Sequence, residues 1–278
     1  MMPVLIFFMR RLFILLCFIS AERAMAQELF VYSEPASNMS AKSIGLRLNN
    51  YFMRQTLTRE NMYQLQPEIM VGLSKKIMLH GEAFFSNMDK NFALEGGSFY
   101  AKYRFFSNDD VHSHFRMAAY GKIAVNNALV HHPAIDLNGH NSGYEAGIVA
   151  TQLINKFAFS AGGSVVHALD NSNGHKFYLP EKNRNAVSYN VAIGKLMLPK
   201  EYVDYNQVNV NLMLEMLGQT NLATRNHFLD LAPSVQFIFL SKMRLDIGYR
   251  YAVIKDLQRL YDNSFFVRFE YNLFNAFK

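Results

Sequence analysis

The chain has 278 residues, of which 50% are hydrophobic and 14% aromatic, with a formal net charge of +6 and a single cysteine. This length suits one large domain, and the positive charge is too mild to indicate a nucleic-acid partner. Cys17 lies in an apolar N-terminal run, so we expect neither disulfide bonds nor thiol chemistry in the mature chain.

The N-terminus has the pattern of a secretory signal peptide over residues 1–26. Arginines precede an apolar run at 12–19, and a small-x-small triplet ends at Ala26. Because positive residues normally stand directly before the apolar core, the pattern also fits a start of translation at Met9. The apolar run is too short for a spanning helix. We therefore predict an exported protein in which residues 27–41 form a periplasmic lead-in.

The rest of the chain alternates apolar and polar residues with a period of two, which is typical of strands with two different faces. The expected strands lie at 44–49, 63–71, 79–85, 98–105, 115–126, 144–151, 157–165, 187–193, 208–216, 229–239, 243–253 and 265–277. Pro67 and Pro233 fall inside two of them. They should mark bulges or local breaks, because proline removes a donor from the ladder.

The connections between these strands alternate in length. Several connections after even-numbered strands are tight, such as 155–156 and 241–242, whereas those after odd-numbered strands include the long segments 126–142 and 169–185. Short periplasmic turns and longer outer loops are typical of outer-membrane barrels. We therefore predict an all-β fold over residues 42–278: a single antiparallel transmembrane β-barrel of about 12 strands, with both termini periplasmic.

The last segment, SFFVRFEYNLFNAFK at 264–278, places large aromatic residues on one face. It must close the barrel against the first strand, since an open edge would leave backbone groups unpaired in lipid. Its end, Phe277 followed by Lys278, resembles the C-terminal signal by which the barrel-assembly machinery recognises its substrates.

The signal peptide, the alternating strands and this terminal aromatic residue together resemble gram-negative outer-membrane β-barrel proteins. Two stretches resemble a narrower group of uncharacterised transporter-like barrels, distantly similar to the phenol-degradation meta-pathway barrels: YSEPASNMSAKSIGLRL (32–48) and GKLMLPKEYVDYNQVNVNLMLEMLGQ (194–219). The resemblance implies a location in the outer membrane of a gram-negative bacterium. It also implies contact with outer-membrane lipid and with the assembly machinery.

The polar face of the strands should point into the lumen and carries charges of both signs. The lumen-facing candidates are Arg47, Glu68, Glu82, Lys102, Arg104, Arg116, Lys122, Glu215, Arg244, Asp246, Arg250, Arg268 and Glu270. One interpretation is a charged constriction that selects solutes by charge and size. The other is an ion-pair network that fills a bore too narrow to conduct.

A basic cluster on two neighbouring strands suggests a selectivity. If Glu68, Glu82 and Glu145 neutralise this cluster only partly, the remaining positive potential should favour anions, and salt should weaken that preference by screening. The cluster consists of Lys102, Arg104, Arg116 and Lys122.

Four loop histidines raise the hypothesis of a metal site. His131, His132 and His140 share one outer loop, and His175 lies on the next. No acidic or thiolate partner stands at a metal-binding spacing. We therefore interpret them as solvated loop residues and expect neither metal nor cofactor.

An outer-leaflet lipid hydrolase is the enzyme alternative, and HALDNSNGHKF (167–177) comes nearest to its motif. Asp170 stands two residues before Ser172, where the base histidine belongs, and His167 and His175 have the wrong spacing for a base that must reach the hydroxyl. We predict a channel or transporter-like barrel for a small solute, without catalysis. A non-conducting structural or adhesion barrel is the other alternative.

Overall fold

The computed structural model describes residues 30–88, 91–201 and 207–277 of the 278-residue chain. The predicted signal peptide lies outside the described residues. The strands are β1 (Ser43–Gln55), β2 (Asn61–Gly72), β3 (Ile77–Ser86), β4 (Ala93–Asp109), β5 (Ser113–Asn126), β6 (Gly143–Ile154), β7 (Phe157–Ala168), β8 (Asn185–Leu198), β9 (Asn209–Asn221), β10 (His227–Phe239), β11 (Met243–Lys255) and β12 (Tyr261–Leu273). Two short 3-10 turns, η1 (Ser172–Gly174) and η2 (Glu181–Asn183), lie between β7 and β8.

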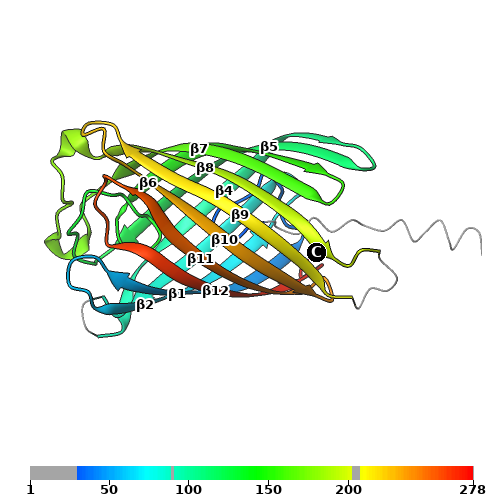
Figure 1. The fold of residues 1–278 in the computed structure, drawn as a ribbon, viewed down its shortest axis with the longest axis horizontal. Helices are drawn as coiled ribbons and strands as arrows, with labels where there is room; N and C mark the ends of the chain where they lie inside the picture. The colour runs from blue at the N-terminus through cyan, green and yellow to red at the C-terminus, as the bar shows by residue number, and fades with distance from the viewer. Residues whose placement is uncertain (1–29, 89–90, 202–206, 278) are drawn as a thin grey trace, which may run out of the picture.

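The twelve antiparallel strands form one closed barrel, as the sequence predicts. Each strand pairs with its neighbours in the chain, and β12 pairs with β1 to complete the ring. Figure 1 shows the tilted strands, with the C-terminus at one end and the long β5–β6 and β7–β8 connections at the other. No helix in the described part of the chain is long and apolar enough to cross a membrane.

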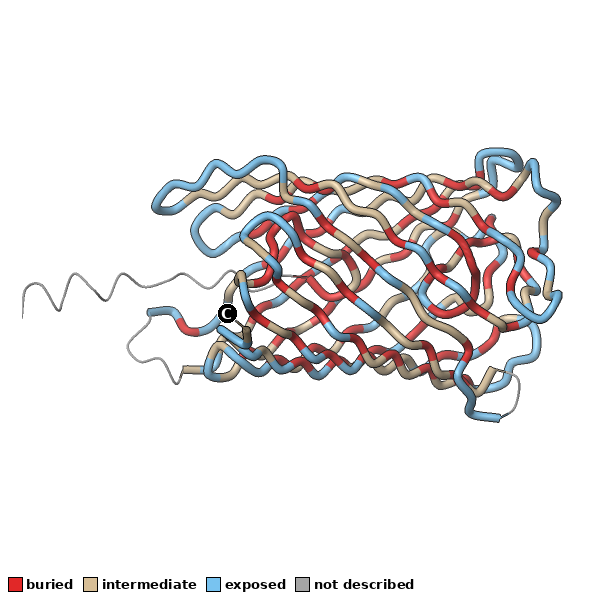
Figure 2. Tube along the Cα trace, turned by 180° about the vertical axis from the view of Figure 1, so that it is seen from behind, coloured by how far each residue is buried: buried red, intermediate tan, exposed pale blue. Residues whose placement is uncertain are grey.

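The two faces of the wall differ in chemistry along every strand. Figure 2 shows buried and more exposed residues alternating along the strands. Large apolar side chains are exposed on the outside, such as Ile148, Val191 and Phe269, whereas inward-facing Glu215 and Asp246 are fully buried. An apolar exterior with a polar interior is the pattern that a barrel surrounded by lipid requires.

The two strand prolines interrupt pairing on one side only. The β2–β3 ladder has no pairs at 66–67, beside Pro67, and the β10–β11 ladder has none at 232–233, beside Pro233. The register is the same on both sides of each gap, and both residues stay paired with their other neighbour. A local break therefore accommodates each missing donor.

The chain before β1 runs inside the barrel. We call residues 30–42 the N-terminal plug. Phe30 and Val31 are buried against the inward side chains of Met213 and Phe266, and Ala36 packs against Ala118. We expected a periplasmic lead-in at 27–41, but its described part occupies the bore instead.

A second segment fills the bore from the opposite end. Residues 127–142, which we call the inner loop, connect β5 to β6 and fold inward. Ile135 and Leu137 of this loop are buried in a cluster with Phe84 and Val166 of the wall. The interior is therefore narrowed from both ends by segments that are not part of the sheet.

Candidate functional site

The structure places all thirteen lumen-facing candidates on the inner face of the wall. Most belong to buried ion pairs, because the register sets opposite charges across from each other. Arg47 lies directly across from Glu68 on β2 and Glu270 on β12. Its guanidinium is 3.1 Å from Glu68 and 3.0 Å from Glu270.

Ion pairs also run along β11 and from β11 across to β12. Arg244 is 2.7 Å from Asp246, and Arg268, which lies opposite Asp246, is 3.4 Å from it. Arg268 also donates a 2.7 Å hydrogen bond to Asn49 on β1. This side of the bore is a network of alternating charges held by the strand register.

The basic cluster expected to favour anions is largely neutralised. Lys122 is 2.8 Å from Glu82, and Arg116 is 3.0 Å from Asp109. Lys102 donates to the backbone carbonyls of Pro35 and Ser37 in the plug. The positive potential available for anion selectivity is therefore smaller than the sequence suggests, and anion preference stays a prediction.

Arg104 is the fourth member of this cluster. Arg104 lies directly across from Ala118 in the β4–β5 ladder. The side chain of Ala118 packs against Ala36 of the plug, so Arg104 is also on the inner face of the wall.

Glu215 is the anchor of the plug. Its Oε1 accepts hydrogen bonds from the backbone N–H groups of Val31 at 2.7 Å and Tyr32 at 2.9 Å. Its Oε2 accepts from the backbone N–H of Ser33 at 2.8 Å and from the Ser33 hydroxyl at 2.6 Å. Successive N–H groups of this kind form a concave anion site, here filled by a carboxylate of the wall.

Basic residues of the wall make further contacts with the plug. Arg244 and Arg268 donate to the carbonyls of Phe30 and Val31, the latter at 2.7 Å. Glu34 forms an ion pair with Arg47 at 3.1 Å and lies 3.5 Å from Lys102. Wall charges that the sequence predicts as lumen-facing are thus used to bind the plug.

The inner loop is attached to the wall through its backbone. The carbonyl of Asn138 accepts hydrogen bonds from the side chains of Gln64 at 2.9 Å and Gln66 at 2.6 Å. Ile135 and Gln219 exchange two hydrogen bonds, because the Gln219 amide both accepts from and donates to the backbone of Ile135. These contacts account for backbone groups that would otherwise be buried unpaired.

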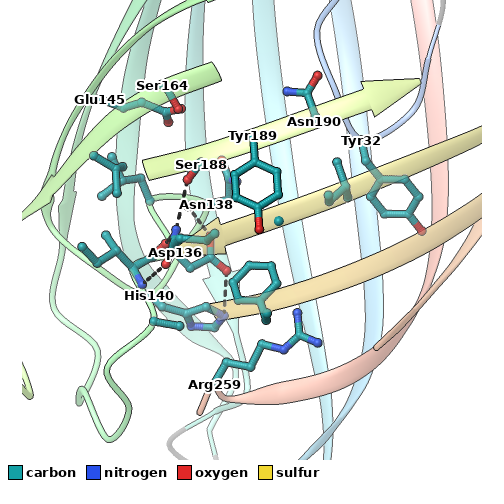
Figure 3. A pocket seen from close by; sticks show the side chains of 18 of the residues that line it. Tyr32, Asp136, Asn138, His140, Glu145, Ser164, Ser188, Tyr189, Asn190 and Arg259 are labelled. Atoms are coloured by element: carbon teal, nitrogen blue, oxygen red, sulfur yellow. Dashed lines mark hydrogen bonds and ion pairs between the residues drawn. The ribbon is translucent and has the colours of Figure 1, made fainter. Parts of the chain in front are cut away.

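In the part of the barrel that the structure describes, two cavities lie between the plug and the inner loop. One measures about 190 Å³ and the other about 210 Å³. Their linings share Tyr32, Tyr120, Asn138, Glu145 and Asn190. Figure 3 shows polar side chains from the wall, the plug and the loop converging on the first cavity. The bore is thus an interrupted path, with space on both sides of Tyr32.

The loop histidines separate into two groups. His132 and His140 are both buried, with ring centroids 6.2 Å apart. His131 is exposed, and the imidazole of His175 contacts the carbonyl of Asn127 at 2.7 Å. Within the described ranges, no three histidine, cysteine, aspartate or glutamate side chains form a group that could hold a metal ion.

Burial lowers the pKa of His132 to about 3, and the neighbouring His140 adds to the shift while Asp136 opposes it. Burial also lowers the pKa of His140. Both imidazoles are therefore neutral near pH 7.

Acid should weaken the inward position of the inner loop. A solvated His132 takes up a proton near pH 6.5, whereas the buried one does so near 3. Each pH unit below 6.5 therefore costs the inward position about 1.4 kcal/mol through His132 alone. At pH 5 this is about 2 kcal/mol, or roughly a 30-fold larger outward population. The measurement is thiol labelling of an Ala134→Cys variant at pH 8 and pH 5.

The matched control for this experiment adds His132→Phe to the labelled variant, which keeps a buried ring but removes the titration. Its labelling should depend less steeply on pH. Labelling that is equal at the two pH values in the parent, or an unchanged slope with His132→Phe, contradicts the prediction.

The serine motif of the hydrolase alternative lies in the β7–β8 connection. Asp170 accepts from the backbone N–H of Phe177 and forms an ion pair with Arg184. The His167 imidazole contacts the Asn185 side chain, and Ser172 begins the exposed turn η1. These contacts indicate a structural role for the connection.

Several residues of the interior have no signal in the sequence that marks them as inward-facing. Glu34 and Tyr32 lie in a segment without strand periodicity, and Arg259 lies in the β11–β12 connection, yet Arg259 is buried and paired with Asp230 at 2.5 Å. No periodic signal marks such positions. The one available sign for the plug is the apolar pair Phe30–Val31 at the start of a segment that is otherwise mostly polar.

The chain is similar in structure to two porins and to an outer membrane channel. A COG4313 outer membrane channel from Pseudomonas putida F1 matches 88% of this chain and 100% of its own, with a TM-score of 0.57 and 9% identity. NanC porin matches 82% of this chain and 100% of its own, with a TM-score of 0.53 and 10% identity. KdgM porin matches 82% and 98%, with a TM-score of 0.50 and 9% identity.

At this identity the likenesses show the fold, which is that of outer-membrane porin and channel barrels. No family model and no curated protein matches the sequence. The narrower likeness to the phenol-degradation meta-pathway barrels stays a prediction.

Proposed function

We propose that this protein is a channel in the outer membrane of a gram-negative bacterium, that it passes a small polar solute without catalysis, and that the N-terminal plug must shift during passage. Both termini then lie on the periplasmic side, and the β5–β6 and β7–β8 connections lie outside. The aromatic face of β12 is the segment that the barrel-assembly machinery would recognise.

The observation that supports this function most is the interrupted bore. A barrel built only for rigidity would fill its interior with side chains, whereas here two cavities remain between the plug and the inner loop. The plug is held by hydrogen bonds and ion pairs to the wall rather than by covalent links. Such contacts are individually worth only about 1–3 kcal/mol, so they permit movement.

A non-conducting structural barrel is the second candidate. The paired charges of β1, β2, β11 and β12 favour it, because a network of this kind stiffens the wall and leaves little free charge for a passing ion. Current across a bilayer separates the two candidates.

A reversible lock on the plug tests the channel. The backbone N–H of Ala36 is 2.9 Å from the Thr151 hydroxyl, so an Ala36→Cys/Thr151→Cys pair should form a disulfide. The background is clean, because the only cysteine is Cys17 in the predicted signal peptide. In planar bilayers the wild type should conduct, the oxidised pair should lose most of its current, and reduction should restore it.

The two single-cysteine variants are the controls and should conduct equally with and without reductant. Absence of current in the wild type and in the reduced pair would favour the structural barrel. Current that persists in the oxidised pair would show that solute passes the plug without moving it.

A further inference from the structure

One wall of the lumenal cavity of about 190 Å³ is anionic. Glu145 on β6 accepts hydrogen bonds from the hydroxyls of Tyr120 at 3.2 Å and Ser164 at 2.6 Å, and it forms no ion pair among the described residues. Asp136 of the inner loop lines the same cavity, and its carboxylate lies 3.8 Å from the imidazole of His140. Among the described residues neither carboxylate forms an ion pair with a lysine or arginine, and Lys122, which lies across from Glu145 in the β5–β6 ladder, is paired with Glu82.

The opposite wall is cationic. Arg250 on β11 and Arg259 in the β11–β12 connection share one carboxylate, Asp230, which is 2.5 Å from each. Asp262 lies 3.9 Å from Arg259 but is paired more closely with Lys255, at 2.9 Å. Two guanidinium groups on Asp230 therefore leave an excess of positive charge at this wall.

Arg250 is the member of this pair whose terminal guanidinium nitrogens can bind a ligand. It binds Asp230 through Nε, and its terminal nitrogens donate no hydrogen bond within the described part of the chain. Its side chain keeps 19% exposure and lines the cavity. A guanidinium edge of this kind is suited to a carboxylate.

Neutral polar atoms lie between the charged walls. The side-chain oxygens of Tyr32 and Asn190 are buried without a hydrogen-bond partner among the residues that the structure describes, and both residues line the cavity. Figure 3 shows Glu145 and Arg259 on opposite sides of the pocket, with Asn190 and Tyr32 on a third. A buried polar atom without a hydrogen-bond partner is destabilising, so these atoms favour a polar occupant.

We propose that this cavity of about 190 Å³ is a binding site for a small zwitterion, whose ammonium group meets Glu145 and whose carboxylate meets Arg250. A simple cation would face the arginines, and a simple anion would face Glu145 and Asp136. A molecule with both charges satisfies both walls at once, and in a water-poor cavity each contact is stronger than in bulk water. The site rests on the proposed channel function and specifies its substrate class.

The test is calorimetry on the full mature protein refolded in detergent, with three probes of matched length. These are 4-aminobutanoate, butanoate and 1-aminobutane, measured at pH 7 and equal ionic strength. The zwitterion should bind at least about tenfold more tightly than either singly charged probe, because one lost charge contact of about 1.4 kcal/mol is a factor of ten. A series from glycine to 6-aminohexanoate then measures the preferred charge separation.

Two cavity variants and two matched controls locate the site. Glu145→Gln and Arg250→Gln should each weaken 4-aminobutanoate binding about tenfold, and Glu145→Gln should also remove its advantage over butanoate. Glu181→Gln and Arg225→Gln change exposed residues of the β7–β8 and β9–β10 connections and should leave binding unchanged. Thermal unfolding of each variant establishes that the barrel is intact.

Calorimetry measures binding independently of conductance, so the proposed binding site and the proposed channel function can be rejected separately. Zwitterion binding in a protein that does not conduct would retain the site and overturn the channel. If the protein conducts but binds the three probes equally, or binds none of them, the zwitterion site is overturned. Loss of binding in the control variants would place the zwitterion elsewhere and also overturn the proposal.

Discussion

Replacing Glu215 by glutamine should release the N-terminal plug and raise the conductance of the barrel. The carboxylate accepts four hydrogen bonds, all from residues 31–33. Glutamine has one acceptor oxygen, and its NH₂ group would oppose either the donors at Ser33 or those at Val31 and Tyr32. Hydrogen bonds to a charged group are worth about 1.5–3 kcal/mol each, so losing two of them shifts the plug equilibrium by about 3 kcal/mol or more, roughly 100-fold.

Two measurements follow the plug in this variant. A cysteine at Ala36, which is fully buried, should react with a thiol reagent much faster in the Glu215→Gln background. Single-channel recordings should show longer or larger openings. Glu181→Gln, on an exposed turn, is the matched control and should behave as the parent. Equal labelling rates in both backgrounds would mean that Glu215 does not hold the plug.

Arginine at Val191 should destabilise the barrel far more than arginine at the adjacent Asn190. Val191 lies near the middle of β8 and exposes 50% of its surface on the outer face. A basic residue on the lipid face near the bilayer centre costs about 2–4 kcal/mol. Asn190 faces the bore and lines both cavities together with Glu145, so a guanidinium there meets polar side chains and a carboxylate rather than lipid. We expect a cost below about 1 kcal/mol at that position.

The free energy of unfolding of both variants is measured by urea titration after refolding into lipid vesicles. The two losses of unfolding free energy can be compared directly, because the two residues are neighbours in one strand and differ only in the face of the wall that they occupy. Similar losses at both positions would mean that the outer face does not contact lipid. Refolding in detergent, where the outer face is less strictly apolar, should reduce the difference.

Gln236 and Asn211 illustrate why the inner face is not uniformly tolerant. The sequence indicates only that both are polar and inward. In the structure Gln236 is fully buried and accepts a 2.9 Å hydrogen bond from Asn211, so a larger side chain has no room there. Space in the bore depends on the plug and the inner loop, which alternation along a strand does not describe.

The wall could be predicted from the sequence because its physical cause is local. A strand between lipid and a polar interior must alternate, and Phe269 between Arg268 and Glu270 shows this directly. The surrounding lipid also explains why the barrel closes, since unpaired backbone groups at a strand edge are costly in lipid. The strand count and the two faces therefore follow from short stretches of chain.

The filling of the bore could not be predicted, because its causes are distant in the chain. Asn138 is an ordinary loop residue until Gln64 and Gln66 are placed beside its carbonyl. Residues 30–42 likewise have no period, and their position depends on Glu215 and Arg268. A segment that uses backbone groups for its contacts leaves little trace in side-chain pattern.

The position of the plug also constrains the order of assembly. Val31 contacts Glu215 and Arg268, which follow it by 184 and 237 positions in the chain. These partners have not yet been synthesised when residues 30–42 are made. The inner wall that binds the plug is incomplete until β12 has paired with β1. Contacts between such distant positions form late, because the entropy of closing long loops precedes any gain. The plug is therefore among the first parts of the barrel to be synthesised and among the last to reach its final position.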